Sequence, residues 1–129
     1  MSYFFSKILE DTTIEESIER VNEALASEGF GVISTINVSE TLKEKIDVDF
    51  KDYIILGACN PHHAHKALLS EDKIGLFLPC NFIVVNMGNG NTEVSAIDPL
   101  ASMAAVENSD LEEFALKVKS SLISVINKL

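Results

Sequence analysis

The stretch Tyr53-Ile54-Ile55-Leu56-Gly57-Ala58-Cys59-Asn60-Pro61 joins a continuous apolar run directly to an Asn-Pro pair. An apolar run without alternation is typical of a strand that is covered on both faces. Asparagine is preferred just before a helix, and proline suits the first helical position because its missing N–H costs nothing there. The stretch therefore predicts a strand over residues 53–58, central in a sheet, and a helix from Pro61 to about Ser70.

A second Cys-Asn pair follows in Leu78-Pro79-Cys80-Asn81, between apolar runs that predict strands at 74–78 and 82–87. The 14 residues from Asn60 to Lys73 are about the minimum for a parallel β-α-β crossover. We therefore expect Cys59 and Cys80 just past the carboxyl ends of two parallel strands. That edge is where open α/β sheets place ligands.

The remaining segments show ordinary strand and helix signals. A glycine-rich turn at 88–91 predicts a hairpin, since its spacing fits no phosphate-binding loop. Thr13 and Glu16 form a capping box, and an apolar stripe of helical period runs from Leu111 to Leu129. We expect further strands at 3–9 (an edge), 30–36 and 92–97, and helices at 14–28, 40–46, 99–106 and 109–129.

Composition limits the class of protein. The 129 residues are 47% apolar and 23% charged, which favours one globular domain over residues 1–129. The net charge of −10 opposes binding to nucleic acid. The sequence shows neither a signal peptide nor an apolar run of membrane-spanning length. With two cysteines only, we expect a cytoplasmic protein with reduced thiols, although a Cys59–Cys80 disulfide is chemically open.

The chemistry of the Cys-Asn stretch allows several interpretations. Cys59 precedes a helix N-terminus, which could make its thiol more acidic than a free one and suit it as a nucleophile, redox group or metal ligand. It could equally be a small buried apolar residue at the end of a strand. Asn60 and Asn81 have plain roles as a helix cap and a turn residue.

The histidines add a metal hypothesis. Cys59 and Cys80 together with His65, or in its place His62, could supply the ligands of zinc or another soft metal, although no Cys-x-x-Cys motif is present. His62 and His65 lie three apart on one helix face, and we expect His65 to point inward and His63 elsewhere.

Several motifs together resemble the bacterial and archaeal domain-of-unknown-function 302 family. They are Gly57-Ala58-Cys59-Asn60-Pro61, Ala64, Ala67-Leu68, Ile74-Gly75-Leu76, Leu78-Pro79-Cys80-Asn81 and Ser95-Ala96-Ile97-Asp98-Pro99. The resemblance covers nearly the whole chain from Thr13. It implies an α+β domain of two layers, with helices on a mixed, mainly antiparallel sheet of five to six strands, and a homodimer. It implies no established activity, and His62 and His63 match no fixed histidine of the family.

Three functions remain open on this basis. The first is a module that binds a small ligand or soft metal at a sheet edge through Cys59, Asn60, Cys80, Asn81 and His65. The second is a thiol-dependent enzyme or redox sensor in which Cys59 attacks and Cys80 resolves or stabilises. The third is a structural or interaction domain with inert cysteines. We favour binding, because no general base has a defined position.

Overall fold

The computed structural model describes residues 2–129, which form one five-stranded sheet with helices. The strands run in the order β1-β5-β4-β3-β2, and each neighbouring pair is antiparallel. Their bounds are β1 (Phe4–Leu9), β2 (Gly31–Asn37), β3 (Tyr53–Cys59), β4 (Cys80–Asn86) and β5 (Thr92–Ile97). The helices are α1 (Ile14–Ser27), α2 (Val38–Ile46), α3 (Pro61–Ser70), α4 (Pro99–Ser102) and α5 (Ser109–Lys128), with a 3₁₀ helix η1 (Asp72–Phe77).

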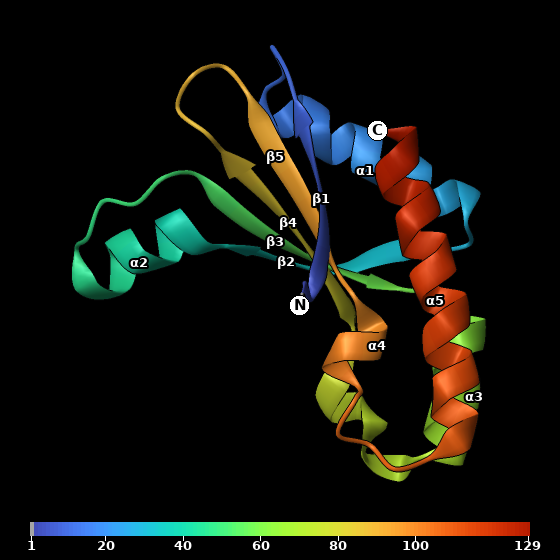
Figure 1. Cartoon of the computed structure of the whole chain (residues 1–129). Coiled ribbons are helices and arrows are strands. Elements are labelled where there is room, and N and C mark those ends of the chain that lie inside the picture. Colours follow the sequence, from blue (N-terminus) through green and yellow to red (C-terminus); the bar gives the residue numbers. More distant parts are fainter. Residues whose placement is uncertain (1) are drawn as a thin grey trace.

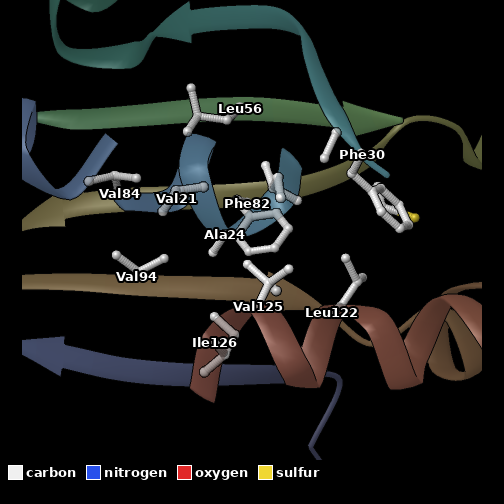
Figure 2. Close-up of a cluster of buried hydrophobic side chains, with 14 of the residues drawn as sticks. Val21, Ala24, Phe30, Leu56, Phe82, Val84, Val94, Leu122, Val125 and Ile126 are labelled. Atoms are coloured by element: carbon white, nitrogen blue, oxygen red, sulfur yellow. The ribbon is translucent and has the colours of Figure 1, made fainter. Parts of the chain in front are cut away.

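One face of the sheet packs against α1 and α5, so the predicted α+β class with helices on a sheet is confirmed (Figure 1). Alternate strand residues such as Leu56, Phe82 and Val94 meet Val21 of α1 and Val125 of α5 in the main core (Figure 2). Each fully buried side chain of this size contributes about 1.5–3 kcal/mol by removal from water. This core fixes which face of every strand points inward.

The ends of α1 follow the predicted signals. The Thr13 hydroxyl accepts from the Glu16 amide at 3.1 Å, and the Glu16 carboxylate accepts from the Thr13 amide at 3.4 Å. Gly29 lies just after the helix with φ of 79°, a conformation that costs glycine little. The capping box therefore starts α1 where the sequence indicates.

The predicted β-α-β crossover is wrong, and so is the strand at 74–78. Residues 72–77 form η1, in which Ile74 is buried but Leu76 is 83% exposed. A lone inward residue offers no alternating pattern to hold the segment in the sheet. The chain instead returns to the edge it left, so β4 runs antiparallel to β3, the sheet has five strands, and β4 rather than β3 lies at its centre.

The opposite face of the sheet, here called the open face, is rich in apolar side chains. Along each strand, the residues that alternate with the core residues point to this face, and the strand register pairs them with one another across neighbouring strands. These are Phe4, Ser6 and Ile8 of β1, Glu93, Ser95 and Ile97 of β5, Asn81, Ile83 and Val85 of β4, Tyr53 and Ile55 of β3, and Ile36 of β2. The main helices α1 and α5 leave this face bare.

The helix α2 projects away from the layer formed by α1 and α5 (Figure 1). It begins at the Asn37 cap, whose side chain accepts from the Glu40 amide, and none of its nine residues is buried. Within residues 2–129, we find no helix with the length and apolar character that crossing a bilayer demands.

Candidate functional site

The two Cys-Asn pairs meet where β3 ends and β4 begins. Ala58 lies opposite Cys80 and Gly57 opposite Asn81 in the antiparallel ladder. The expected meeting of Cys59 and Cys80 at one edge of the sheet is therefore confirmed, although antiparallel strands produce it. Pro79 precedes β4 with a cis peptide bond to Leu78, at the strand end where a residue without an amide donor fits.

A cavity of about 20 Å³ lies between the two cysteines, Asn60 and His63. Its wall includes Phe30 and Phe114, whose ring centroids each lie 6.4 Å from that of His63. A space of this size holds about one water molecule. The end of β3 and the start of β4 around Cys59 and Cys80, here called the cysteine edge, therefore have no room for an organic ligand.

Burial makes both thiols less acidic. Cys59 and Cys80 are free, and desolvation raises the pKa of Cys59 above its ordinary 9.0. Desolvation, and secondarily the nearby Cys59, raise the pKa of Cys80 to about 11. Of the two alternatives for Cys59, the raised pKa favours the partly buried, less reactive thiol over the acidified one. The Asn60 side chain accepts from the His62 and His63 amides at the start of α3.

The inward histidine is His63, and the expectation that His65 points inward is wrong. His65 is exposed, whereas His63 is partly buried between Phe30 and Phe114. Ala67, four residues later on the same face of α3, is buried against α5. The spacing of His63 and Ala67 was the sequence signal for this orientation. Desolvation, with smaller contributions from Lys117, Lys66 and His62, lowers the pKa of His63 and favours its neutral form.

His65 is not brought together with Cys59 and Cys80, the two cysteines predicted to share a metal with it. His65 lies on the exposed side of α3, away from the cavity between Cys59 and Cys80. In the part of the chain that the structure describes, no three His, Cys, Asp or Glu side chains form a group that could hold a metal ion. The set Cys59, Cys80 and His65 therefore has no geometric support as a zinc site.

The two asparagines have different positions. Asn60 caps α3 as predicted, and its amide nitrogen lies 3.1 Å from where a side chain on Gly29 would begin. Asn81 follows the buried Cys80 and points to the open face, because neighbouring residues of a strand alternate. The second Cys-Asn pair thus divides between the core and the open face.

Asn81 lines a hollow of about 310 Å³ on the open face. Phe4, Ile83 and Ile97 supply its apolar walls, and Tyr53, Asn81 and Glu93 supply polar groups. Small Ser95 lines the hollow, and its hydroxyl shares a hydrogen bond of 2.6 Å with that of Ser6, the residue opposite it in β1. Apart from Asn81, sequence reasoning missed this site. The signal was the apolar pattern on both faces of β3 and β4.

The comparisons with known proteins agree with this fold. The family described as "Domain of unknown function DUF302" matches residues 5–129. A solved structure, described as the crystal structure of uncharacterized conserved protein DUF302 from Bacillus stearothermophilus, is 31% identical with a TM-score of 0.89. That similarity covers 99% of this chain and 98% of the other. No curated protein matches at a significant level.

Proposed function

The chain belongs to the DUF302 family, a domain of unknown function, and from its own geometry we propose that it binds a small amphipathic molecule in the hollow of the open face. The observation that carries this proposal is a hollow of about 310 Å³ whose lining combines apolar side chains with three polar residues, Tyr53, Asn81 and Glu93. Sites for small molecules are mostly apolar clefts of about 300–1,000 Å³ in which a few polar groups fix the orientation.

The polar groups indicate the chemistry of the ligand. The Asn81 amide both donates and accepts, the Tyr53 hydroxyl does the same, and the Glu93 carboxylate accepts and carries a negative charge. Glu93 is the ionisable carboxylate among the hollow's lining residues, on a chain whose net charge is −10. A neutral or cationic ligand with an apolar body and a hydrogen-bond donor fits this lining better than an anion.

Other sites support binding less well. A groove of about 470 Å³ lies between the start of α1, the start of α2 and the β4–β5 turn, but Thr13, Asn37, Asp52 and Asn86 make its lining largely polar. Burial of apolar area supplies most of the free energy for small ligands, and the hollow offers more of it. The cysteine edge has space for about one water molecule.

The thiol-enzyme alternative has weaker support than binding. A nucleophilic cysteine needs a depressed pKa, whereas burial raises the pKa of Cys59 and raises that of Cys80 to about 11. We therefore assign both thiols a packing role at the cysteine edge, where Cys80 directly precedes Asn81. Soft-metal binding by Cys59 and Cys80 alone is tested directly by metal analysis of protein purified without a histidine tag.

The proposal is tested with fluorescent probes of matched size and different charge. We expect Nile red, which is neutral, and acridine orange, which is cationic, to bind with enhanced fluorescence, and anilinonaphthalene sulfonate, which is anionic, to bind weakly. The variant Glu93→Gln should reduce the preference for acridine orange over the sulfonate by about tenfold. Equal affinity for all three dyes in both proteins would overturn the proposed chemistry.

The control variant is Leu69→Ala, which shortens an exposed apolar side chain on α3. We expect it to leave Nile red binding unchanged, whereas Ile83→Ala in the wall of the hollow should weaken binding. An equal effect of the two substitutions would place the dye elsewhere on the surface and contradict the proposed site.

A further inference from the structure

We propose that a hollow between α3 and α5 is a second binding site, which takes a small zwitterion with an apolar side chain, such as an α-amino acid. This space, here called the interhelix hollow, measures about 290 Å³. It is lined by residues of α3 and α5 alone and shares none of them with the hollow of the open face. The site is therefore independent of the proposed function.

The helices α3 and α5 lie side by side and antiparallel (Figure 1). At one end, the Asn108 side chain donates to the carbonyl oxygen of Ser70 at 3.0 Å. At the other end, the rings of His63 and Phe114 have centroids 6.4 Å apart. These two contacts close the ends of the interhelix hollow.

Each helix turns one polar face toward the interhelix hollow. The polar lining residues are spaced by three and then four positions on both helices, which keeps them on one face. They are His63, Lys66 and Ser70 on α3 and Asp110, Glu113 and Lys117 on α5.

Charges are separated along the interhelix hollow. Desolvation, and then the positive charges of Lys117 and Lys66, lower the pKa of His63, so both ammonium groups lie near its ring. Asp110 lies toward the other end, beside the Asn108 cap, and is about 10 Å from Lys117 along the helix axis. A ligand between them meets positive charge at one end and negative charge at the other.

Two of the charged groups have no partner in the chain. Lys117 pairs with Glu113 at 3.3 Å, whereas within residues 2–129 neither Lys66 nor Asp110 forms an ion pair. The two ammonium groups and the two carboxylates of the lining cancel, so the interhelix hollow has no net charge to attract a simple ion. A molecule that carries both an ammonium group and a carboxylate satisfies Asp110 and Lys66 together.

The floor of the interhelix hollow is apolar. Ala67 and Leu111 are buried in the small core between α3 and α5, and Phe114 packs against that core. An aliphatic side chain gains free energy when it covers such a surface. The bound zwitterion is therefore expected to carry a branched apolar side chain, as leucine does.

We expect weak binding, because the four charged side chains are exposed. Exposed ion pairs contribute little, and the volume lies at the lower limit of small-molecule sites. A dissociation constant of about 1 mM for L-leucine fits these properties.

Titration of isotope-labelled protein with L-leucine tests the site. In two-dimensional NMR spectra we expect the amide signals of residues 63–70 and 110–117 to shift and to saturate. Shifts confined to other residues, or no shift up to about 20 mM leucine, would overturn the proposed site.

Two analogues of leucine test the chemistry of the ligand. Leucinamide lacks the carboxylate, and isocaproate lacks the ammonium group. Each should bind about threefold more weakly than leucine, because each loses one of the two charge contacts. Equal affinity for the three molecules would overturn the zwitterion.

The variant Lys66→Met tests the carboxylate contact. It should bind leucine and isocaproate about threefold more weakly and leucinamide as the wild type does. The matched control is Lys45→Met on α2, which removes an exposed lysine that also forms no ion pair within residues 2–129. Equal losses in the two variants would assign the effect to net charge and overturn the contact.

The variant Asp110→Asn tests the ammonium contact. It should weaken leucine and leucinamide and leave isocaproate unchanged, whereas the control Glu112→Gln, one turn face away on α5, should affect none of the three. Equal losses in these two variants would contradict the role of Asp110. Ile83→Ala on the open face should leave leucine binding intact, and a loss there would place leucine in the other hollow and overturn this site.

Discussion

Burial separates the chemistry of the two thiols, since Cys80 is 5% exposed and Cys59 is partly exposed. We expect iodoacetamide to modify Cys59 slowly near neutral pH and faster as the pH rises toward its raised pKa. Cys80, with a pKa of about 11, should react only when the protein unfolds. Intact-mass spectrometry of the wild type and of Cys59→Ser separates the two reactions. Rapid modification of Cys59 with an apparent pKa below that of free cysteine would contradict this and favour the thiol enzyme.

His63 makes folding stability depend on pH. Desolvation, and then Lys117, Lys66 and His62, lower its pKa below 6.5 in the folded protein, so the unfolded chain binds the proton more tightly. The contribution of neutral His63 to the free energy of unfolding is therefore intact above about pH 6.5, and it is lost as the pH falls through the lowered pKa. We expect His63→Phe, which fills the same space without titrating, to show a smaller loss of stability between neutral and acidic pH. Urea denaturation at each pH measures this difference.

The control for His63 is His65→Gln on the exposed side of α3. It should retain the pH dependence of the wild type. If His63→Phe and the wild type lose the same stability on acidification, partly buried His63 is not the source of the pH dependence.

Gly57 is required by the close approach of two neighbours. A β-carbon there would lie 2.2 Å from the Ser34 hydroxyl oxygen and 2.7 Å from a ring carbon of Pro79. We expect Gly57→Ala to lower the free energy of unfolding by about 1–3 kcal/mol, because Pro79 cannot move without shifting the start of β4. Gly31→Ala, with nothing within 4 Å, is the matched strand control and should cost little. If urea denaturation gives the two variants the same loss in the free energy of unfolding, these glycines affect stability only through their strand propensity.

At the scale of the elements, α3 depends on the cap that Asn60 supplies. Its side-chain oxygen accepts from the His62 and His63 amides at 3.1 and 3.2 Å. We expect Asn60→Ala to cost about 1 kcal/mol in the free energy of unfolding, whereas Asn60→Asp keeps the acceptor and should cost far less. Chemical denaturation of the three proteins measures the difference. Equal losses for both variants would assign Asn60 a role through its amide nitrogen near Gly29 instead.

Local signals predicted most elements of this chain, since caps and periodicity act within a few residues. Thr13, Gly29 and Asn60 mark helix ends where the structure has them. The exception is the segment 74–78, whose apolar residues suggested a strand. The segment forms no strand; Ile74 is buried beside Met103 and Ala67, and Leu78 packs partly buried against the same cluster. Burial by distant residues decided that segment, and no local signal reports it.

For the whole molecule, the net charge of −10 opposes the compact state through repulsion between acidic groups. Raising the salt concentration from about 0.01 M to about 0.15 M shortens the screening length from about 30 Å to about 8 Å. We expect this to add about 1 kcal/mol of stability, which corresponds to a rise of about 4 °C in the midpoint of thermal unfolding. Glucose at the same osmolality is the control and should have a smaller effect. A midpoint that falls with salt would indicate that specific ion pairs outweigh the repulsion.

The sequence by itself determined the family, the α+β class and the caps that start α1 and α3, because caps and periodicity are local properties. The meeting of Cys59 and Cys80 was expected from a parallel crossover that does not form, and antiparallel pairing of β3 with β4 produces it. Only the tertiary structure decided that β3 and β4 run antiparallel, that His63 rather than His65 faces the cavity, and that both thiols are less acidic than free cysteine. Those properties depend on strand pairing and on burial by α5 and the sheet. The hollow beside Asn81 also depends on strand pairing, since register places small Ser95 between Ser6 of β1 and the larger Ile83 of β4.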